Sequence, residues 1–209
     1  MAKKLAVLSE SDLQRVPEKL RIFNKEQLKL ILTKTPESQI KKRKGRGGEM
    51  WSYVNGAYTT KMLNLVFGFD WDFKVLKHEF DLNIGQAYVL GELTVRIGDR
   101  HITKQQFGRV DIKFLTETKK NDKGQVILND WKKPKRFKTK QPMDIGNDLK
   151  AATTDALKKC ASVLGFFSDV YYAEDFLEMQ IVTDDEKEVY KNNAEMENLK
   201  SYLNRAKSA

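Results

Sequence analysis

The chain has 209 residues, of which 40% are hydrophobic and 10% aromatic, so it can build a packed core and is not disordered as a whole. Lys and Arg number 38 against 29 Asp and Glu, and the formal charge of +9 favours a polyanionic partner such as DNA, RNA or an anionic membrane surface. The chain has one cysteine, which excludes an intrachain disulfide. It has only two histidines, so we expect no zinc site.

The N-terminal residues predict helices and then a basic loop. Residues 10–34 carry apolar side chains at helical spacing, with a break at Pro17 and an end at Pro36. Residues 41–48 read KKRKGRGG, and five bases with three glycines in eight positions cannot bury a face. We therefore expect a solvated loop at 41–48.

The next segment, 51–69, combines a turn signal with a short helix. Asn55-Gly56 is a turn dipeptide, and the apolar residues of 62–66 indicate a helix. The rings of Trp51 and Tyr53 have two interpretations. They can belong to the core, or they can stack on bases beside the neighbouring lysines and arginines.

Three strand candidates follow, at 71–82, 86–97 and 101–115. The middle one alternates clearly, with one face formed by Val89, Gly91, Leu93 and Val95 and the other by Tyr88, Leu90, Glu92 and Thr94. Gly98-Asp99 is a hairpin signal between the second and third candidates. The pattern predicts an antiparallel meander with one face left for a helix.

A basic segment follows the third strand candidate. Residues 117–140 contain nine Lys or Arg residues, opposed only by Glu117, Asp122 and Asp130. We expect an extended basic loop or hairpin arm between the sheet and the next helix. Trp131 lies within it, and its ring either contacts a partner or bases or belongs to the core. We see no internal repeat in the chain.

Residues 144–164 give the clearest helical pattern. Asp144 or Asn147 can cap this helix at its start, and Gly165 can end it. One narrow arc collects the apolar stripe: Ile145, Leu149, Ala152, Ala156, Cys160 and Val163.

Three charged residues and the cysteine have distinct places on that helix. Asp155 and Lys158 lie opposite the stripe, and Lys159 lies on its flank. Cys160 is on the stripe and has no recognisable catalytic partner, so it is a core residue rather than a nucleophile.

The charge reverses sign after Phe166. From Ala173 to Leu199 there are nine acids against Lys187 and Lys191, which indicates a peripheral helix or a mobile tail.

These elements predict an α+β fold in which an antiparallel β-meander packs on a long amphipathic helix, with N-terminal helices and an acidic helical tail. We expect a helical segment at 1–34, a core at 35–176 with a basic insertion at 117–140, and the acidic helical or mobile tail at 177–209.

Three stretches, in this order, resemble the Rad-fifty-two type of single-strand annealing proteins, which act in eukaryotic recombination and among phage recombinases. The first is RKGRGGEMWSYVNG at 43–56, the second is VFGFDWDF at 66–73, and the third is ATTDALKKCASVLG at 152–165. In the second, the tryptophan comes one residue earlier than in the family pattern. The resemblance covers about 35–176, and the predicted meander lies between the second and third stretches as it does in the family.

The resemblance implies a β-sheet on the long helix, assembled into a ring or helical filament with single-stranded DNA in a basic outer groove. Arg43, Lys158 and Lys159 match the family's groove bases, Tyr53 matches a motif aromatic, and Ser162 stands where the family often has another Arg. The candidate DNA-binding residues are Arg43, Lys44, Arg46, Tyr53, Lys140, Lys150, Lys158 and Lys159.

The mechanism that the resemblance implies is ATP-independent strand annealing for recombination and repair. Bound phosphates no longer repel a second strand, and bases that face outward can pair with it. We expect no enzyme activity, cofactor or metal. The expected partners are single-stranded DNA, the annealed duplex intermediate, further copies of the chain in a homo-oligomer, and a single-strand binding protein.

Two other functions remain open from the residues. Asp70, Asp72, Glu79, Asp81 and Glu92 are carboxylates that a metal-dependent nuclease could use, although no downstream Glu-x-Lys strand pattern accompanies them. The other alternative is an RNA-binding or scaffold protein. No Walker-type phosphate loop is present, no stretch reaches the roughly 18 apolar residues of a membrane span, and the N-terminus is a poor signal peptide. We expect a cytoplasmic protein without a membrane partner, in the bacterial host if it is phage-encoded.

Overall fold

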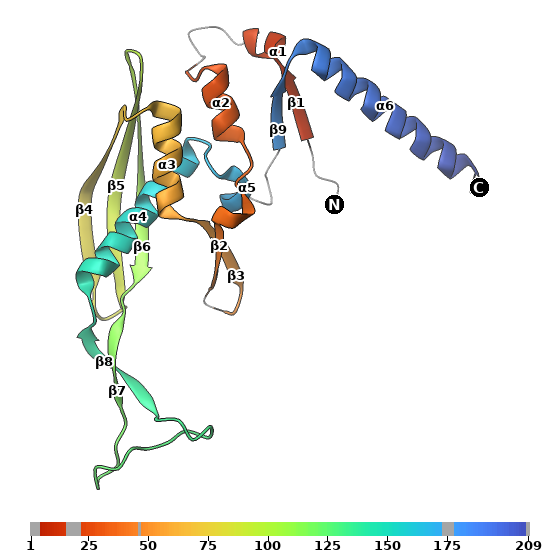
Figure 1. The fold of residues 1–209 in the computed structure, drawn as a ribbon. Coiled ribbons are helices and arrows are strands. Elements are labelled where there is room, and N and C mark those ends of the chain that lie inside the picture. The colour runs from red at the N-terminus through yellow and green to blue at the C-terminus, as the bar shows by residue number, and fades with distance from the viewer. Residues whose placement is uncertain (1–4, 16–21, 46, 173–177, 208–209) are drawn as a thin grey trace. The chain divides into compact units, whose positions relative to one another are not determined.

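The computed structural model describes residues 5–15, 22–45, 47–172 and 178–207, which fold as two compact units (Figure 1). The terminal unit contains the described residues of 1–70, 96–101 and 164–209, and the sheet unit contains 71–95 and 102–163. Helices and antiparallel strands mix in the chain, and the predicted α+β class is confirmed.

The sheet unit is built on a three-stranded antiparallel sheet with the order β4-β5-β6. Its strands are β4 (Trp71–Asp81), β5 (Gln86–Ile97) and β6 (Arg100–Asp111), and helix α4 (Ile145–Val163) packs against the sheet. The hairpin predicted at Gly98-Asp99 is confirmed, because β5 and β6 flank it and Gly98 has a φ of 56°.

The two faces of β5 are those that its alternation predicts. Val89, Leu93 and Val95 are buried, whereas Leu90 and Thr94 are only partly covered. Because successive side chains of a strand point to opposite faces, one face of β5 belongs to the core and the other is half-open to solvent.

Helix α4 approaches the sheet closely because both surfaces carry small residues at the crossing. A Cβ at Gly108 would lie 2.1 Å from the Ala152 carbonyl oxygen, and one at Gly91 would lie 2.9 Å from the Ala156 Cβ. Ala152, Ala156 and Cys160 are fully buried. The spacing of four residues puts these three side chains on one face of α4, where they meet the glycines of the sheet.

The two ends of α4 also agree with the sequence, with one exception. Asp144 Oδ1 accepts a hydrogen bond of 2.9 Å from the Asn147 N–H, so Asp144 is the capping residue, and Gly165 follows the helix with a φ of 103°. The assignment of Val163 to the apolar stripe is wrong. Val163 is 42% exposed, and the buried residues of the last turn are instead Ala161 and Ser162, next to Cys160.

The basic segment 117–140 forms the predicted hairpin arm. Strand β7 (Phe114–Thr118) pairs antiparallel with β8 (Arg136–Pro142), and the intervening residues extend the arm beyond the pair (Figure 1).

The terminal unit has a small aromatic core. The Phe67 ring lies 6.1 Å from that of Phe23 and 6.0 Å from that of Phe166, and the Tyr58 ring lies 5.7 Å from that of Phe167. Its elements are β1 (Leu5–Ser9), α1 (Glu10–Gln14), α2 (Lys25–Leu32), the 3-10 helix η2 (Glu37–Gln39), β2 (Ile40–Lys44), β3 (Met50–Val54), α3 (Gly56–Phe67), α5 (Ser168–Tyr171), β9 (Glu178–Val182) and α6 (Asp184–Lys207).

In the terminal unit one local prediction agrees with the structure and two are corrected. The helical pattern of 10–34 corresponds to α1 and α2, with residues 16–21 outside the described residues. The expected loop at 41–48 is a strand as far as Lys44, because β2 pairs with β3 and the chain reverses through Gly47 and Gly48 at positive φ. Asn55-Gly56 is no hairpin turn, since Asn55 caps α3 through a 3.0 Å bond from the Ala57 N–H.

The acidic tail contains the predicted helix, α6, preceded by a strand that was not predicted. Strand β9 pairs in parallel with β1, so residues from the two ends of the chain share a two-stranded sheet. No helix of the described residues is long and apolar enough to cross a membrane.

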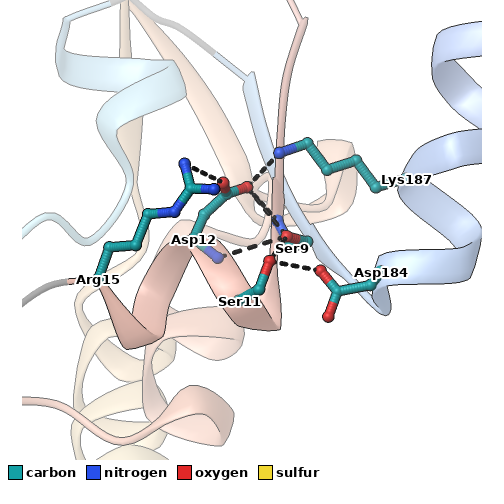
Figure 2. Close-up of polar contacts among 6 residues, drawn as sticks. All are labelled: Ser9, Ser11, Asp12, Arg15, Asp184 and Lys187. Atoms are coloured by element: carbon teal, nitrogen blue, oxygen red, sulfur yellow. Dashed lines mark hydrogen bonds and ion pairs between the residues drawn. The ribbon is translucent and has the colours of Figure 1, made fainter.

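A cluster of polar side chains, which we call the clasp, joins α6 to α1 and to Ser9, the N-cap of α1 (Figure 2). Lys187 forms an ion pair with the Asp12 carboxylate, which also accepts a 2.8 Å hydrogen bond from the Ser9 N–H. Ser11 Oγ donates a 2.6 Å hydrogen bond to Asp184. The Lys187 bond, followed by the Ser9 N–H, lowers the pKa of Asp12 from 3.8 to about 2.

We predict that Gly108→Ala destabilises the sheet unit. The new Cβ would overlap the Ala152 carbonyl oxygen at 2.1 Å, and a backbone atom cannot turn aside as a side chain can. Overpacking of this kind costs about 1–3 kcal/mol or more, which urea denaturation would detect as a lower midpoint. Gly146→Ala in α4 is the matched control, since its Cβ would meet only the Asp144 side chain at 3.4 Å. An equal loss in both variants would contradict the close approach.

We also predict that the clasp protects the β1–β9 pair in a pH-dependent way. The folded pKa of Asp12 lies below its unfolded value of 3.8, so its stabilising effect is complete above about pH 3.8 and is lost as the pH falls through about 2. Lys187→Met should therefore speed amide exchange in Leu5–Ser9 at neutral pH, and the difference from the native chain should shrink near pH 2.

Hydrogen exchange followed by mass spectrometry measures this protection, with Lys191→Met as the control on an exposed position of the same helix. Native protection in Lys187→Met at neutral pH would refute the clasp.

Candidate nucleic-acid interface

The β2–β3 hairpin places cations and aromatic rings on one face. In its register Lys41 lies opposite Tyr53, and Arg43 lies opposite Trp51. Directly opposed residues of an antiparallel pair share a face, so these four side chains lie together. Lys42 and Lys44 lie on the reverse face, so the hairpin is basic on both sides.

The rings of this cation–aromatic face are held in place but not enclosed. The Arg43 guanidinium lies 5.8 Å from the centre of the Tyr53 ring, within the range of a cation–π contact. The Trp51 ring covers Gly45, where a Cβ would lie 2.8 Å from its Nε1, and Nε1 donates a 3.3 Å hydrogen bond to Glu49. Trp51 is 48% exposed, so it is not a core residue, while Tyr53 is partly covered.

The cations of the hairpin are exposed, and their charge is little neutralised by carboxylates of the chain. Lys41, Lys42, Arg43 and Lys44 are all exposed. Lys41 Nζ donates to the Ser38 carbonyl oxygen at 3.3 Å. Within the described residues no ion pair joins Lys42, Arg43 or Lys44 to a carboxylate. Their charge is therefore available to a polyanion.

The lysines of α4 are arranged differently, because they share one carboxylate. Lys159 Nζ lies 3.1 Å from Asp155 Oδ2 and donates a 3.0 Å hydrogen bond to the Phe107 carbonyl oxygen, while Lys158 Nζ lies 3.9 Å from Asp155 Oδ1. The Lys158 side chain is only 11% exposed against 41% for Lys159. Asp155 therefore neutralises part of this charge, and Lys159 is the more accessible of the two.

The remaining candidate residues are distributed over both units. Lys44 lies with Arg43 and Tyr53 in the terminal unit, and Lys140 on β8 and Lys150 on α4 are exposed in the sheet unit. Arg46 lies outside the described residues. The structure thus brings Arg43 together with Tyr53, and Lys158 together with Lys159, as two separate groups.

The arm presents the largest number of exposed cations. Every residue from Lys119 to Lys138 is exposed, and the Trp131 ring is 82% exposed, so the core interpretation of Trp131 is wrong. The basic residues of the arm are Lys119, Lys120, Lys123, Lys132, Lys133, Lys135, Arg136, Lys138 and Lys140.

The arm also contains a repeat that the sequence analysis missed. Asn121 Oδ1 accepts hydrogen bonds from the N–H groups two and four residues later, at 3.1 and 2.8 Å. Asn129 Oδ1 does the same, at 3.1 and 2.9 Å. The dipeptide Asn-Asp occurs at both positions, eight residues apart, and was the available signal.

The carboxylates considered for a nuclease have other partners. Asp70 pairs with Arg96 at 3.2 Å, Glu79 pairs with Lys77 at 2.6 Å, and Glu92 accepts a 2.7 Å bond from Gln105. Across the described ranges no group of three or more His, Cys, Asp or Glu side chains could hold a metal ion.

Cys160 is a core residue, as predicted. It is fully buried, its Sγ lies 3.4 Å from the Lys104 carbonyl oxygen, and burial raises the pKa of its thiol. A nucleophile needs the thiolate and access to a substrate, and this cysteine has neither.

A comparison of this chain with models of known protein families and with curated proteins finds no match.

Proposed function

We propose that the protein binds single-stranded DNA through its phosphates and anneals complementary strands without ATP. The cation–aromatic face of the β2–β3 hairpin carries this proposal, because Lys41, Arg43, Trp51 and Tyr53 lie on one exposed surface. Lysines and arginines bind any sequence by releasing counterions from phosphates, and aromatic rings stack on any base.

The hairpin is suited to a flexible strand rather than to reading base edges in a duplex. Its Trp51 ring is 48% exposed and can stack on an unpaired base, whereas a duplex hides its base faces in the stack. The exposed cations on both faces of the hairpin can contact a backbone that bends around it. The described residues of the chain thus support sequence-tolerant binding, in which specificity comes from base pairing with the second strand.

Lys158 and Lys159 are a second proposed phosphate contact, on the sheet unit. A phosphate that approaches Lys159 competes with Asp155, which lies 3.1 Å from the ammonium. The strand would replace an internal ion pair at this place, so the affinity gained per lysine is smaller than at the hairpin.

The resemblance to annealing proteins extends the proposal to assembly. A ring or helical filament of copies would repeat the basic surface along the strand and hold many phosphates at once. The annealed duplex is then the product, a single-strand binding protein is a further partner, and the cytoplasm is the expected compartment.

The proposal predicts faster annealing without nucleotide. Mixing the full chain with complementary oligonucleotides should accelerate duplex formation in the absence of ATP, because phosphate repulsion between the strands is reduced. A pair of fluorophores that is quenched on pairing follows the rate. No acceleration at any salt concentration would reject annealing, and shortening of the strands with magnesium would favour a nuclease.

A second prediction concerns the hairpin directly. Arg43→Gln should weaken binding to all oligonucleotide sequences alike and flatten the slope of log affinity against log salt by about 0.7, the value for one phosphate contact on a single strand. Fluorescence anisotropy over a salt series measures the slope.

The matched control is Lys77→Gln, which removes an exposed lysine that is already paired with Glu79 at 2.6 Å. The control should bind like the native chain. A native slope in Arg43→Gln would show that Arg43 contacts no phosphate.

A further inference from the structure

We infer that residues 129–133, the tip loop of the arm, form a second contact for single-stranded DNA, in which Trp131 stacks on an unpaired base and Lys132 and Lys133 hold the adjacent phosphates. The inference takes its ligand from the proposed function but places it on the sheet unit, in a segment to which the resemblance assigns no role.

The backbone of the tip loop is held by hydrogen bonds, although the loop has no core of its own. Asn129 Oδ1 accepts from the N–H groups of Trp131 and Lys133, the Asn129 N–H donates to the Lys133 carbonyl oxygen at 2.8 Å, and the Lys132 N–H donates to the Asn129 carbonyl oxygen at 2.9 Å. These bonds fix the backbone on both sides of the indole, so little conformational entropy remains to be lost when a base binds.

Three backbone hydrogen bonds form a closed ring where the tip loop joins the rest of the arm. Lys119 N–H donates to Lys135, Lys135 N–H donates to Ile127, and Ile127 N–H donates to Lys119, at 2.8, 2.8 and 2.9 Å. Lys119, Ile127 and Lys135 follow one another at intervals of eight residues. Lys119 precedes the first Asn loop, Ile127 lies between the two loops, and Lys135 follows the second. The ring holds the two Asn loops on one support without any buried side chain.

The two loops differ in what they present. The first has Gly124 at positive φ, 77°, and the second has Lys132 at the equivalent position with a φ of 56°. A left-handed conformation is less favourable for a residue with a Cβ than for glycine. The second loop thus keeps a cation where the first uses glycine, directly beside an indole that is 82% exposed.

The charge around the indole identifies the kind of partner. The arm carries nine cations against Glu117, Asp122 and Asp130, so its complement is a polyanion. An exposed tryptophan that two lysines follow directly matches a polyanion that also has flat, unpaired rings. A single strand has both features, whereas a duplex hides its base faces in the stack.

The experiment compares variants of the full chain in binding a labelled thymidine oligonucleotide by fluorescence anisotropy. Trp131→Ala should weaken binding by about tenfold with an unchanged salt slope, and Trp131→Phe should restore most of the loss. The double variant Lys132→Gln with Lys133→Gln should flatten the slope by about 1.4, since two phosphate contacts are removed. Val126→Ala, which truncates another exposed apolar side chain of the arm, should bind like the native chain.

A strand with abasic sites separates stacking from a structural effect. Trp131→Ala and the native chain should bind the abasic strand equally, because it offers no ring to stack on. Equal binding of the two proteins to the thymidine strand, or an equal loss on both strands, would overturn the stacking role.

The proposed function can fail separately. If Arg43→Gln weakens binding and the tip variants do not, the hairpin binds the strand and the inference about the tip loop is wrong. If the native chain binds no oligonucleotide, the proposed function and the tip contact both fail.

Discussion

The close approach of α4 to the sheet at Gly91 and Gly108 is the constraint on which the sheet unit depends. At Gly108 no side chain separates the two elements, since a Cβ there would fall 2.1 Å from the Ala152 carbonyl oxygen. At Gly91 a Cβ would meet the Phe73 ring and the Ala156 Cβ. Dispersion contacts weaken steeply with distance, so two backbones that touch gain contacts that larger side chains would hold apart. The small residues Ala152, Ala156 and Cys160 are the helix's part of this arrangement.

This approach lets side chains of α4 bond to the backbone of β6 and of the segment that follows it. Asp155 accepts from the Arg109 N–H at 3.2 Å, and Asp148 accepts from the Lys113 N–H at 3.1 Å. Lys113 directly precedes the arm, and its carbonyl oxygen accepts a 2.7 Å bond from the Met143 N–H on the returning chain. The start and the end of the arm are therefore fixed to each other and to α4. Its outer part depends on backbone hydrogen bonds and on those that the Asn121 and Asn129 side chains accept.

Asp155 has two functions in this arrangement. It satisfies the free backbone N–H of an outer strand, which would otherwise be an open hydrogen-bond donor, and it is the counterion of Lys158 and Lys159. The same carboxylate thus holds α4 to β6 and lowers the net charge around Lys158 and Lys159.

Local sequence patterns predicted the structure correctly where an element depends mainly on residues close to it in the sequence. The alternation of β5 and the hairpin at Gly98-Asp99 depend on neighbours within a few residues and were predicted correctly. Asp144 was one of the two residues expected to cap α4. The β1–β9 pair was not predicted, because its partners are more than 170 residues apart and their pairing leaves no local periodicity.

The basic strand β2 was mistaken for a loop for a related reason. KKRK has neither alternation nor apolar content, and only its pairing with β3 makes it a strand. The same pairing determines which of its cations share a face with Trp51 and Tyr53. The composition of the candidate interface could be predicted from the sequence, whereas the selection of Lys41 and Arg43 for the aromatic face required the register.

Net charge is therefore a poor guide to which cations bind a strand. Lys158 and Lys159 lie on the clearest helix and match a family pattern, yet they share a carboxylate, and Lys158 is 11% exposed. Lys42, Arg43 and Lys44 lie on a short hairpin and have no carboxylate partner within the described residues. A phosphate gains the full release of its counterions only from a cation that is not already neutralised. In the proposed function, the hairpin should accordingly contribute more than the α4 lysines to the salt dependence of binding.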